Sequence, residues 1–279
     1  MVLLDGEWLI SSEARLPFNN RGTYYGDALF ETIRCFDGKP LLFEAHYFRL
    51  MASMRIMRMS IPDTFTPEFF EENIEKILYK NGLQQHARIR ITVWRQSGGL
   101  YTPTNQEVNY SIESQELQGQ YKIIPSREVE LFKDHYTNTG LLANLKIANK
   151  QVNVLAGIFA VENGFDDMFL VNHNKMIVET IAGNIFLRKG KLIKTPRLQD
   201  GCLNGIMREQ VLQQFKKMLD YTVVEDTITP FELQRADEIF TSNVIKGIQP
   251  ITQYRKKTYS QETAAELITI FNDLFFRSS

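Results

Sequence analysis

The chain has 279 residues, of which 43% are hydrophobic and 23% are charged, and its formal net charge at pH 7 is −1. This composition predicts a globular protein with a substantial core, and the near-zero charge gives no electrostatic footprint for nucleic acid or an anionic membrane. No apolar run reaches the roughly 20 residues that span a bilayer, and the N-terminus lacks the features of a signal peptide. We therefore expect no nucleic-acid partner and no membrane association.

The cysteines and histidines form no pattern typical of a disulfide or a metal site. Cys35 and Cys202 lie far apart and make no CxxC motif, so neither a disulfide framework nor a zinc site is expected. A reducing cytoplasm is the expected compartment. The four histidines are scattered without the spacing of metal ligands. The sequence therefore predicts no metal site.

The first 118 residues predict a small mixed α/β domain, in which apolar residues recur at strand or helix spacing. Asp37-Gly38 between two apolar runs predicts a hairpin turn. Thr66 and Pro67 are typical of a helix start, and Asn81-Gly82 is typical of a helix end. Ser97–Pro103 predicts a mobile loop. The predicted strands are 2–4, 29–35, 41–43, 87–94 and 108–113, and the predicted helices are 44–59 and 66–80.

A second domain is predicted for residues 119–279, after the polar stretch Ser114–Gln120. Leu187–Leu192 predicts a tight hairpin, a helix begins near Gly205, and Ser260 caps a C-terminal helix. The predicted strands are 121–124, 168–171, 176–179 and 238–242, and the predicted helices begin at residue 146, at residue 205 and after residue 260. We expect two domains, 1–118 and 119–279, with Lys146 and Glu179 in the second.

Lys146 and Glu179 are candidates for the cationic and the anionic contact to a single cofactor. Lys146 lies where an irregular stretch turns into an apolar helix, and Glu179 ends a short strand. Judged singly, each residue is more simply explained as a solvated surface charge. Their occurrence together, in this order, favours a shared function.

Other segments could contact a phosphate or another surface. Arg49 could present a rigid guanidinium fork, although a helix that also holds Arg55 and Arg58 more often has solvated or ion-paired arginines. The helix start after Gly205 leaves N–H groups that can bind an anion, as every helix start does. The glycines and tyrosines of Arg21–Arg34 indicate either a close backbone approach or a packed turn. No GxGxxG or GxxxxGK[ST] motif occurs, which excludes the usual dinucleotide and P-loop sites.

Seven segments that together span nearly the whole chain form an ordered set. They are RGTYYGDALFETIR (21–34), HYFRL (46–50), LKIANKQVNVLA (145–156), IVETIAGNIFL (177–187), KTP (194–196), LNGIMR (203–208) and ADEIFTSNVIKGIQPI (236–251). This set resembles the class IV aminotransferases, which are fold-type IV pyridoxal-phosphate enzymes and include branched-chain and D-amino-acid aminotransferases and aminodeoxychorismate lyases. The resemblance implies a two-domain α/β fold with pyridoxal 5'-phosphate at the domain interface, a homodimer, and an amino-acid or amino-chorismate substrate.

The resemblance also implies roles for individual residues. Lys146 corresponds to the Schiff-base lysine and proton shuttle, and Glu179 to the carboxylate that pairs with the pyridine nitrogen. Arg49 corresponds to the phosphate-binding arginine. Further cofactor contacts are implied for Leu203, Gly205, Ile206, Met207, Asn243 and Val244, and substrate contacts for Phe30, Arg90 and Leu100.

Two departures from the familiar aminotransferase pattern, and one from the lyase pattern, leave the reaction open. Met207 and Asn243-Val244 stand where that pattern has threonines, and both changes resemble the lyases. The glycine-rich loop Gly98–Tyr101, however, lacks the arginine that such lyases often carry. We expect an aminotransferase acting on a small amino acid and a 2-oxo acid. The alternatives are an aminodeoxychorismate lyase that releases pyruvate and p-aminobenzoate, and a non-catalytic binding protein of the same fold.

Overall fold

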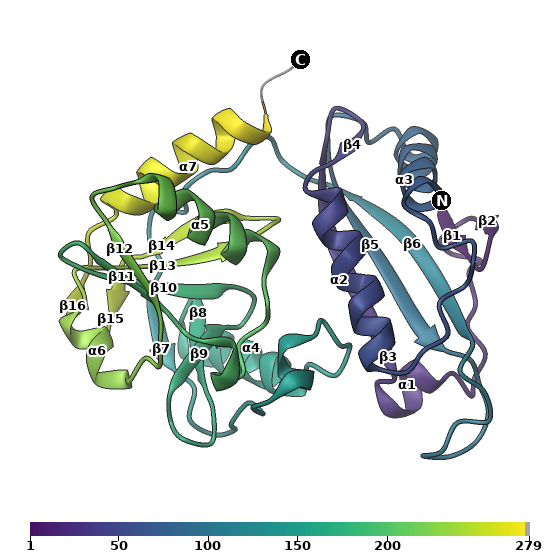
Figure 1. The fold of residues 1–279 in the computed structure, drawn as a ribbon, viewed down its shortest axis with the longest axis horizontal. Coiled ribbons are helices and arrows are strands. Elements are labelled where there is room, and N and C mark those ends of the chain that lie inside the picture. Colours follow the sequence, from purple (N-terminus) through teal and green to yellow (C-terminus); the bar gives the residue numbers. More distant parts are fainter. Residues whose placement is uncertain (277–279) are drawn as a thin grey trace. The chain divides into compact units, whose positions relative to one another are not determined.

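The computed structural model describes residues 1–276, which form two compact units, each with its own sheet and core (Figure 1). The first unit contains Met1–Gln120 and Lys146–Asn149. The second contains Tyr121–Leu145 and residues 150–276. The predicted division into domains 1–118 and 119–279 stays a proposal. The four-residue segment that begins with Lys146 is grouped with the first unit, although its expected place is the second domain.

The first unit is built on a six-stranded antiparallel sheet. Its strands are β1 (Val2–Leu4), β2 (Glu7–Leu9), β3 (Ala28–Phe36), β4 (Lys39–Pro40), β5 (His86–Arg95) and β6 (Val108–Glu116), in the order β2-β1-β6-β5-β3-β4. β3 pairs with β5 along the whole length of β3, from Ala28 opposite Trp94 to Phe36 opposite His86. Alternate residues of β5 are buried over most of the strand, which is the pattern of a sheet with one face on the core.

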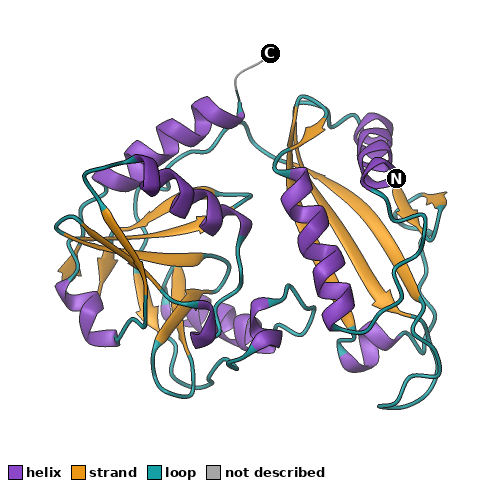
Figure 2. Ribbon diagram, viewed as in Figure 1, coloured by secondary structure: helices purple, strands orange, loops and turns teal. Residues whose placement is uncertain are grey.

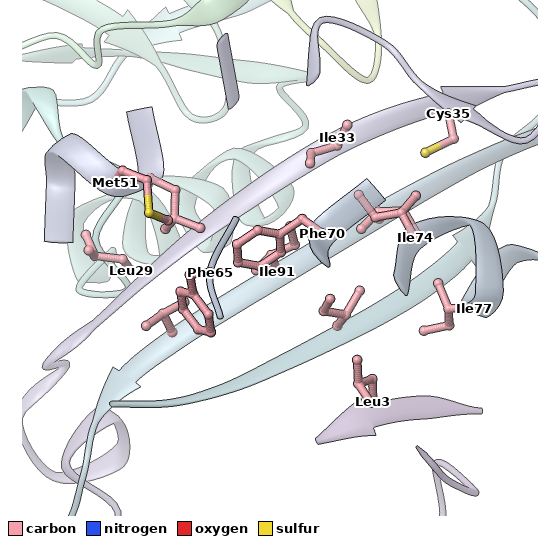
Figure 3. Close-up of a cluster of buried hydrophobic side chains, with 14 of the residues drawn as sticks. Leu3, Leu29, Ile33, Cys35, Met51, Phe65, Phe70, Ile74, Ile77 and Ile91 are labelled. Atoms are coloured by element: carbon pink, nitrogen blue, oxygen red, sulfur yellow. The ribbon is translucent and has the colours of Figure 1, made fainter. Parts of the chain in front are cut away.

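Three helices belong to the first unit, and two of them cover the buried face of its sheet (Figure 2). They are α1 (Arg21–Tyr25), α2 (Phe43–Ile56) and α3 (Pro67–Asn81). The predicted ends of α3 are confirmed, because the Thr66 side chain accepts a hydrogen bond from the Phe69 amide and Gly82 adopts φ 65°. The core is filled by aliphatic and aromatic side chains from α2, α3 and the sheet, including Met51, Phe70, Ile74, Ile77, Leu29, Ile33 and Ile91 (Figure 3).

Two predictions for the first unit are wrong in their details. The strand predicted at 41–43 is absent, because the hairpin partner β4 ends at Pro40 and α2 begins at Phe43. Helix α2 also ends at Ile56, earlier than the predicted Met59. Arg58 takes a left-handed conformation with φ 54°, which turns the chain out of the helix.

The second unit contains a larger sheet. Its strands are β7 (Val129–Leu131), β8 (Asp167–Val171), β9 (Ile177–Thr180), β10 (Asn184–Lys189), β11 (Leu192–Thr195), β12 (Thr222–Glu225), β13 (Glu238–Asn243) and β14 (Gly247–Ile251). The order is β12-β11-β10-β9-β8-β7, and β13 pairs with both β10 and β14. A separate pair is formed by β15 (Gln253–Tyr254) and β16 (Lys257–Thr258).

Helices flank this sheet and make β8 a strand that is buried on both faces. The α-helices are α4 (Gln151–Asn163), α5 (Ile206–Lys217), α6 (Pro230–Arg235) and α7 (Glu262–Phe275), and the 3₁₀ turns are η1 (Leu141–Asn144) and η2 (Leu198–Asp200). Phe169 and Val171 of β8 pack in one core, and Met168 and Leu170 pack in another that includes Ala156 of α4. This double burial explains the apolar run Met168–Val171 in β8.

Three predictions for the second unit are corrected. Residues 121–124 form no strand, because the Tyr121 and Ile124 amides donate to side chains of α7 and β14 instead of to a neighbouring strand. The helix predicted at Lys146 begins only at Gln151. Helix α7 begins at Glu262 with Gln261 as its N-cap, rather than with the predicted Ser260.

The alternation of helices and strands along the chain confirms the predicted mixed α/β class. Within residues 1–276, no helix combines the length and the apolar composition needed to cross a membrane. The same residues contain no cluster of three or more His, Cys, Asp or Glu side chains that could hold a metal ion.

Candidate active site

Lys146 lies in an extended segment that adds to the edge of the first unit's sheet. The Phe30 amide donates to the Lys146 carbonyl at 2.9 Å, and the Ala148 amide donates to the Ala28 carbonyl at 2.9 Å. Between these bonds, Ile147 pairs with Leu29 in an antiparallel bridge. Because Ile147 packs against the core and strand residues alternate in direction, Lys146 projects to the opposite face. Backbone pairing to β3 thus determines where the amine lies.

Phe30 is a common neighbour of two cations. The Lys146 Nζ lies 4.5 Å from the centre of the Phe30 ring, and the Arg90 Cζ lies 4.0 Å from the same centre. Arg90 also donates to Thr92 Oγ1 at 3.2 Å and lies 3.7 Å from a carboxylate oxygen of Glu113. Burial lowers the pKa of Arg90, an effect that Glu113 opposes and Arg88 reinforces. The structure therefore brings together the predicted residues Lys146, Phe30 and Arg90.

Arg49 of α2, which is itself partly exposed, forms an ion pair with the buried Glu31, the next residue of β3 after Phe30. Its Nε donates to Glu31 Oε1 at 2.7 Å, and its Nη2 donates to Glu31 Oε2 at 2.6 Å. His46, one turn earlier on α2, bonds the same Oε2 through Nδ1 at 2.7 Å. The side chains of Glu31 and His46 are only 2% and 1% exposed. Sequence reasoning gave these two residues no role, although a glutamate inside the apolar strand LFETI was a signal for one.

The charges in this cluster are set by burial and by close partners. Burial raises the pKa of Glu31, but the charge of Arg49 and the hydrogen bonds from Arg49 and His46 outweigh it and lower the pKa to about 2. Burial lowers the pKa of His46; hydrogen bonding and the charge of Glu31 oppose this shift, and Arg49 and Lys146 add to it. At neutral pH, Glu31 is therefore an anion and His46 is neutral.

In the second unit, Glu179 lies beside the turn that leads into α5. One of its carboxylate oxygens accepts a hydrogen bond from the Leu203 amide at 2.9 Å. Asn184 pairs with Glu179 across β9 and β10, and its Nδ2 donates to the Leu203 carbonyl at 2.8 Å. The Leu203 backbone is thus held by two neighbouring side chains. Asn184 was missed by sequence reasoning, although it lies within the segment that carries Glu179.

Gly205 is the N-cap of α5 and makes a close approach that requires a glycine. A Cβ atom at this position would lie 1.9 Å from Asn184 Oδ1. Ile206 and Met207 follow in the first helical turn, where backbone N–H groups have no partner within the helix. The Met207 side chain is buried, so only its amide can contribute to an anion site.

Asn144 holds the other side of the same turn. Its Nδ2 donates to the carbonyls of Leu198 and Cys202 at 2.9 and 2.7 Å, and its own carbonyl accepts from the Asn204 amide at 3.2 Å. This residue also lies just before Lys146 in the chain. Nothing in the sequence marks it, because its partners are backbone groups more than fifty residues away.

Asn243 and Val244 lie where β13 turns into β14. The Asn243 side chain accepts from the Ile245 amide at 2.8 Å and donates to the Ala182 carbonyl. The Val244 carbonyl accepts from the Tyr121 hydroxyl at 2.8 Å. These contacts shape the turn locally, and a cofactor role for either residue stays a prediction.

Leu100 belongs to a glycine loop that Arg21 holds. Arg21 Nη1 donates to the carbonyls of Gly98 and Leu100 at 3.1 and 2.6 Å, and its Nε donates to Asp27 at 3.0 Å. The Leu100 side chain is 76% exposed. Its predicted contact with substrate stays untested.

The candidate residues of each unit suit a particular kind of ligand group. The first unit presents an amine, an aromatic ring and guanidinium groups, which suit a nucleophile and anion binding. The second presents a carboxylate and a helix N-terminus, which suit a cationic ring nitrogen and a phosphate respectively.

Comparison with known proteins finds one family over most of the chain. The family described as Amino-transferase class IV matches residues 28–254. The aminodeoxychorismate lyase of Bacillus subtilis is 26% identical, with 94% of this chain and 89% of the relative covered. The D-alanine aminotransferase of Listeria monocytogenes is 25% identical, with 90% and 86% covered. The solved structure of the branched-chain aminotransferase from the archaeon Thermoproteus uzoniensis with norvaline matches with a TM-score of 0.89 at 21% identity, covering 98% of this chain and 94% of that one.

These matches confirm the predicted resemblance and the fold-type IV architecture. The family match includes Arg49, Lys146 and Glu179. The relatives and the solved structure carry three different activities, so the comparisons identify the family and leave the substrate open. The chain therefore belongs to the class IV aminotransferases, a family of pyridoxal-phosphate-dependent aminotransferases and lyases, and it is an enzyme of that family.

Proposed function

We propose that this chain is a pyridoxal 5'-phosphate-dependent aminotransferase, which moves an amino group between a small amino acid and a 2-oxo acid. The observation that supports this proposal best is the position of Lys146 in a class IV aminotransferase chain: its amine is fixed beside Phe30, and Phe30 also contacts Arg90. The cofactor, when bound, accepts the electron pair that remains after a bond to the substrate Cα breaks.

The residues present fit this cofactor. Arg49 supplies a guanidinium and the start of α5 supplies the Ile206 and Met207 amides, which are donors that suit a phosphate dianion. Because Gly205 has no Cβ, the turn before α5 can pass close to Asn184. This close packing holds the start of α5, and with it the two amides, in place. Glu179 would supply an anion for the protonated pyridine nitrogen, and Leu203 would pack on the ring. Asn243 and Val244 are proposed to lie near the phosphate.

Lys146 performs the proton chemistry in this proposal. Its amine would hold the cofactor through a covalent bond to the cofactor aldehyde and, once the substrate amine has replaced it there, would take the proton from the substrate Cα and pass it to the cofactor carbon. The Phe30 ring lies against the Lys146 amine and restricts the positions that Nζ can reach. Arg90 is proposed to bind the substrate carboxylate, because it is a half-buried cation on the Lys146 side of the sheet. Leu100 is proposed as a further substrate contact.

Aminodeoxychorismate lyase is the second candidate, and two features favour it. Met207 and Asn243 stand where the aminotransferase pattern has hydroxyl groups, and Met207 is buried and offers none. The Bacillus subtilis relative also has this activity. Both reactions use Lys146 to remove the Cα proton. They differ in the step after removal of this proton: elimination then breaks a bond to a leaving group on the substrate, whereas transamination does not.

The cofactor proposal is tested by colour. Wild-type protein mixed with pyridoxal 5'-phosphate should show a visible absorption band that borohydride removes. Lys146→Ala should lose the covalent band, and its turnover should fall by at least about 10³-fold. Lys150→Ala, which changes a lysine four residues further on, should keep both. A wild-type protein that binds no cofactor contradicts the proposal, and a coloured protein without turnover indicates a binding protein of the same fold.

The reaction is tested by mass spectrometry of the products. The assay offers L- and D-amino donors with several 2-oxo acids, and aminodeoxychorismate in parallel. Exchange of an amino group between donor and acceptor supports the aminotransferase. Release of p-aminobenzoate and pyruvate without any exchange overturns it in favour of the lyase.

We also propose that the chain forms a homodimer, as the family resemblance implies. Size-exclusion chromatography with light scattering tests this proposal, and a monomer at micromolar concentration contradicts it.

A further inference from the structure

We infer that Glu31, supported by His46, is a positioning residue that holds the Arg49 guanidinium in the orientation in which it binds the cofactor phosphate. The inference rests on the proposed function, because it assumes that Arg49 binds phosphate. It assigns roles to two buried side chains, Glu31 and His46, that the proposed mechanism does not use.

The geometry of the pair determines the direction of the guanidinium. Arg49 donates from Nε and Nη2 to the two oxygens of Glu31, at 2.7 and 2.6 Å. Two parallel bonds of this kind fix the plane of the guanidinium as well as its position. Arg49 is long and flexible, so without Glu31 it would lose side-chain entropy each time it bound a phosphate. Glu31 orders it in advance.

A purely structural role explains the cluster poorly. Glu31 lies on an apolar strand face between Leu29 and Ile33, both almost completely buried. Removing a carboxylate and a guanidinium from water is costly, and apolar residues of similar volume often stabilise a fold equally well or better. A buried ion pair is therefore a weak device for stability. It is an effective device for fixing the direction of a charged group that must act on a ligand.

His46 holds Glu31 without adding charge. Because the Glu31 carboxylate is ionised, Nδ1 of His46 must donate the proton in their 2.7 Å hydrogen bond. Among the described residues, the buried Nε2 of His46 has no hydrogen-bond partner. A protonated Nε2 at this position would leave a buried donor unsatisfied, so the neutral form is favoured. Glu31 is thus held from one side by a neutral donor and from the other by Arg49.

The test compares two ligands that differ only in phosphate. Absorption titration of apoprotein measures the dissociation constants of pyridoxal 5'-phosphate and of pyridoxal. Glu31→Gln should weaken pyridoxal 5'-phosphate by about 10- to 100-fold, the effect expected for charge-assisted bonds that are no longer aligned. Pyridoxal should change by less than about 2-fold, because it has no phosphate for Arg49 to bind. The ³¹P resonance of the bound phosphate should also shift.

Matched variants separate positioning from general destabilisation. Glu238→Gln alters another fully buried carboxylate that pairs with an arginine, Arg188 at 3.2 Å, and should leave the ratio of the two constants unchanged. His46→Asn keeps a donor for Glu31 and should retain most of the phosphate preference, whereas His46→Leu should lose it. In an Arg49→Lys background, Glu31→Gln should add little, because its effect passes through Arg49.

The outcomes distinguish this inference from the proposed function. If wild-type protein binds neither ligand, the proposed function fails and the inference fails with it. If wild-type protein prefers the phosphorylated ligand and Glu31→Gln keeps that preference, only the inference fails. Equal weakening of both ligands by Glu31→Gln assigns the pair a structural role and also overturns the inference. Should Glu31→Gln fail to fold by circular dichroism, the contrast between His46→Asn and His46→Leu decides in the same way.

Discussion

At the scale of single residues, strand alternation gives neighbouring residues of β3 different functions. Phe30 projects to one face, where its ring contacts Lys146 and Arg90. Glu31 projects to the other face, where its buried carboxylate pairs with Arg49 and with the buried His46. A shift of one residue in the register of β3 would exchange the two faces and separate both groups. The register between β3 and β5 is therefore a requirement of the candidate site.

The first prediction concerns acid stability. The pKa of Glu31 is lowered from 4.5 to about 2 in the folded protein, so its contribution to stability is present above pH 4.5 and is lost as pH falls toward 2. Over this window, the free energy of unfolding of wild-type protein should fall more steeply than that of Glu31→Gln. The difference is about 1.4 kcal/mol per pH unit, or roughly 3 kcal/mol in total. Urea denaturation at several pH values measures this difference. If the free energy of unfolding depends on pH in the same way for wild type and Glu31→Gln, the lowered pKa of Glu31 is refuted.

The second prediction concerns Asp27, which lies between two buried arginines. Arg21 and Arg95 both donate to its Oδ2, at 3.0 and 2.9 Å. Asp27→Asn leaves these cations without a balancing charge and should destabilise the protein by about 3–5 kcal/mol. Glu72→Gln, which breaks the exposed 3.1 Å pair with Lys76, should cost less than about 0.5 kcal/mol. Equal effects in urea denaturation would contradict this account.

At the scale of elements, the position of α5 depends on the turn before it. Glu179 and Asn184 hold the Leu203 backbone, and Asn144 holds the adjoining carbonyls and the Asn204 amide. A helix N-terminus binds an anion only if its amides point at the anion. The polar side chains around this turn therefore determine the direction of the amides that are proposed to bind phosphate.

The third prediction compares two glycines. A methyl group at Gly205 would lie 1.9 Å from Asn184 Oδ1, so Gly205→Ala should destabilise the protein by about 1–3 kcal/mol and weaken binding of pyridoxal 5'-phosphate. Gly157→Ala, in the interior of α4, meets no atom within 4 Å and should stabilise the protein by about 0.5–1 kcal/mol. Thermal denaturation with and without cofactor checks both. Stabilisation by Gly205→Ala would show that the turn is not tightly packed.

The accuracy of the predicted elements follows the range of the interactions that form them. Helix α3 is predicted correctly because its signals, Thr66, Pro67 and Gly82, lie in the helix or next to it. The strand predicted at 121–124 fails because its amides bond to Asn272 and Gln249, which are more than a hundred residues away. Partners so far away in the sequence do not affect the local pattern of apolar and polar residues from which a strand is predicted.

At the scale of the whole molecule, the chain returns to its first unit for four residues. Lys146–Asn149 extends the sheet of that unit, and the residues on either side belong to the second. The candidate residues are therefore contributed by both units. Lys146 and Arg49 come from the first, and Glu179 and the start of α5 come from the second.

The fourth prediction follows from this division. If one pyridoxal 5'-phosphate binds both groups, its addition should slow hydrogen exchange in two sets of peptides, one with residues 43–56 and 146–149 and one with residues 177–180 and 203–208. At a ligand concentration of about 100 times the dissociation constant, the protein should gain about 2.7 kcal/mol in stability. Mass spectrometry detects the exchange. Protection confined to one unit would contradict a shared cofactor.

The sequence by itself determined the family and the mixed α/β class, and it predicted roles for Lys146, Glu179 and Arg49. These rest on residue types in a fixed order, which is information carried along the chain. Only the tertiary structure showed that Lys146 lies on a sheet edge instead of a helix, and that Glu31 and Asn184 hold Arg49 and Leu203. The reason is physical, because hydrogen-bond partners and buried charges are chosen by long-range strand register and packing, which periodicity in the sequence does not report.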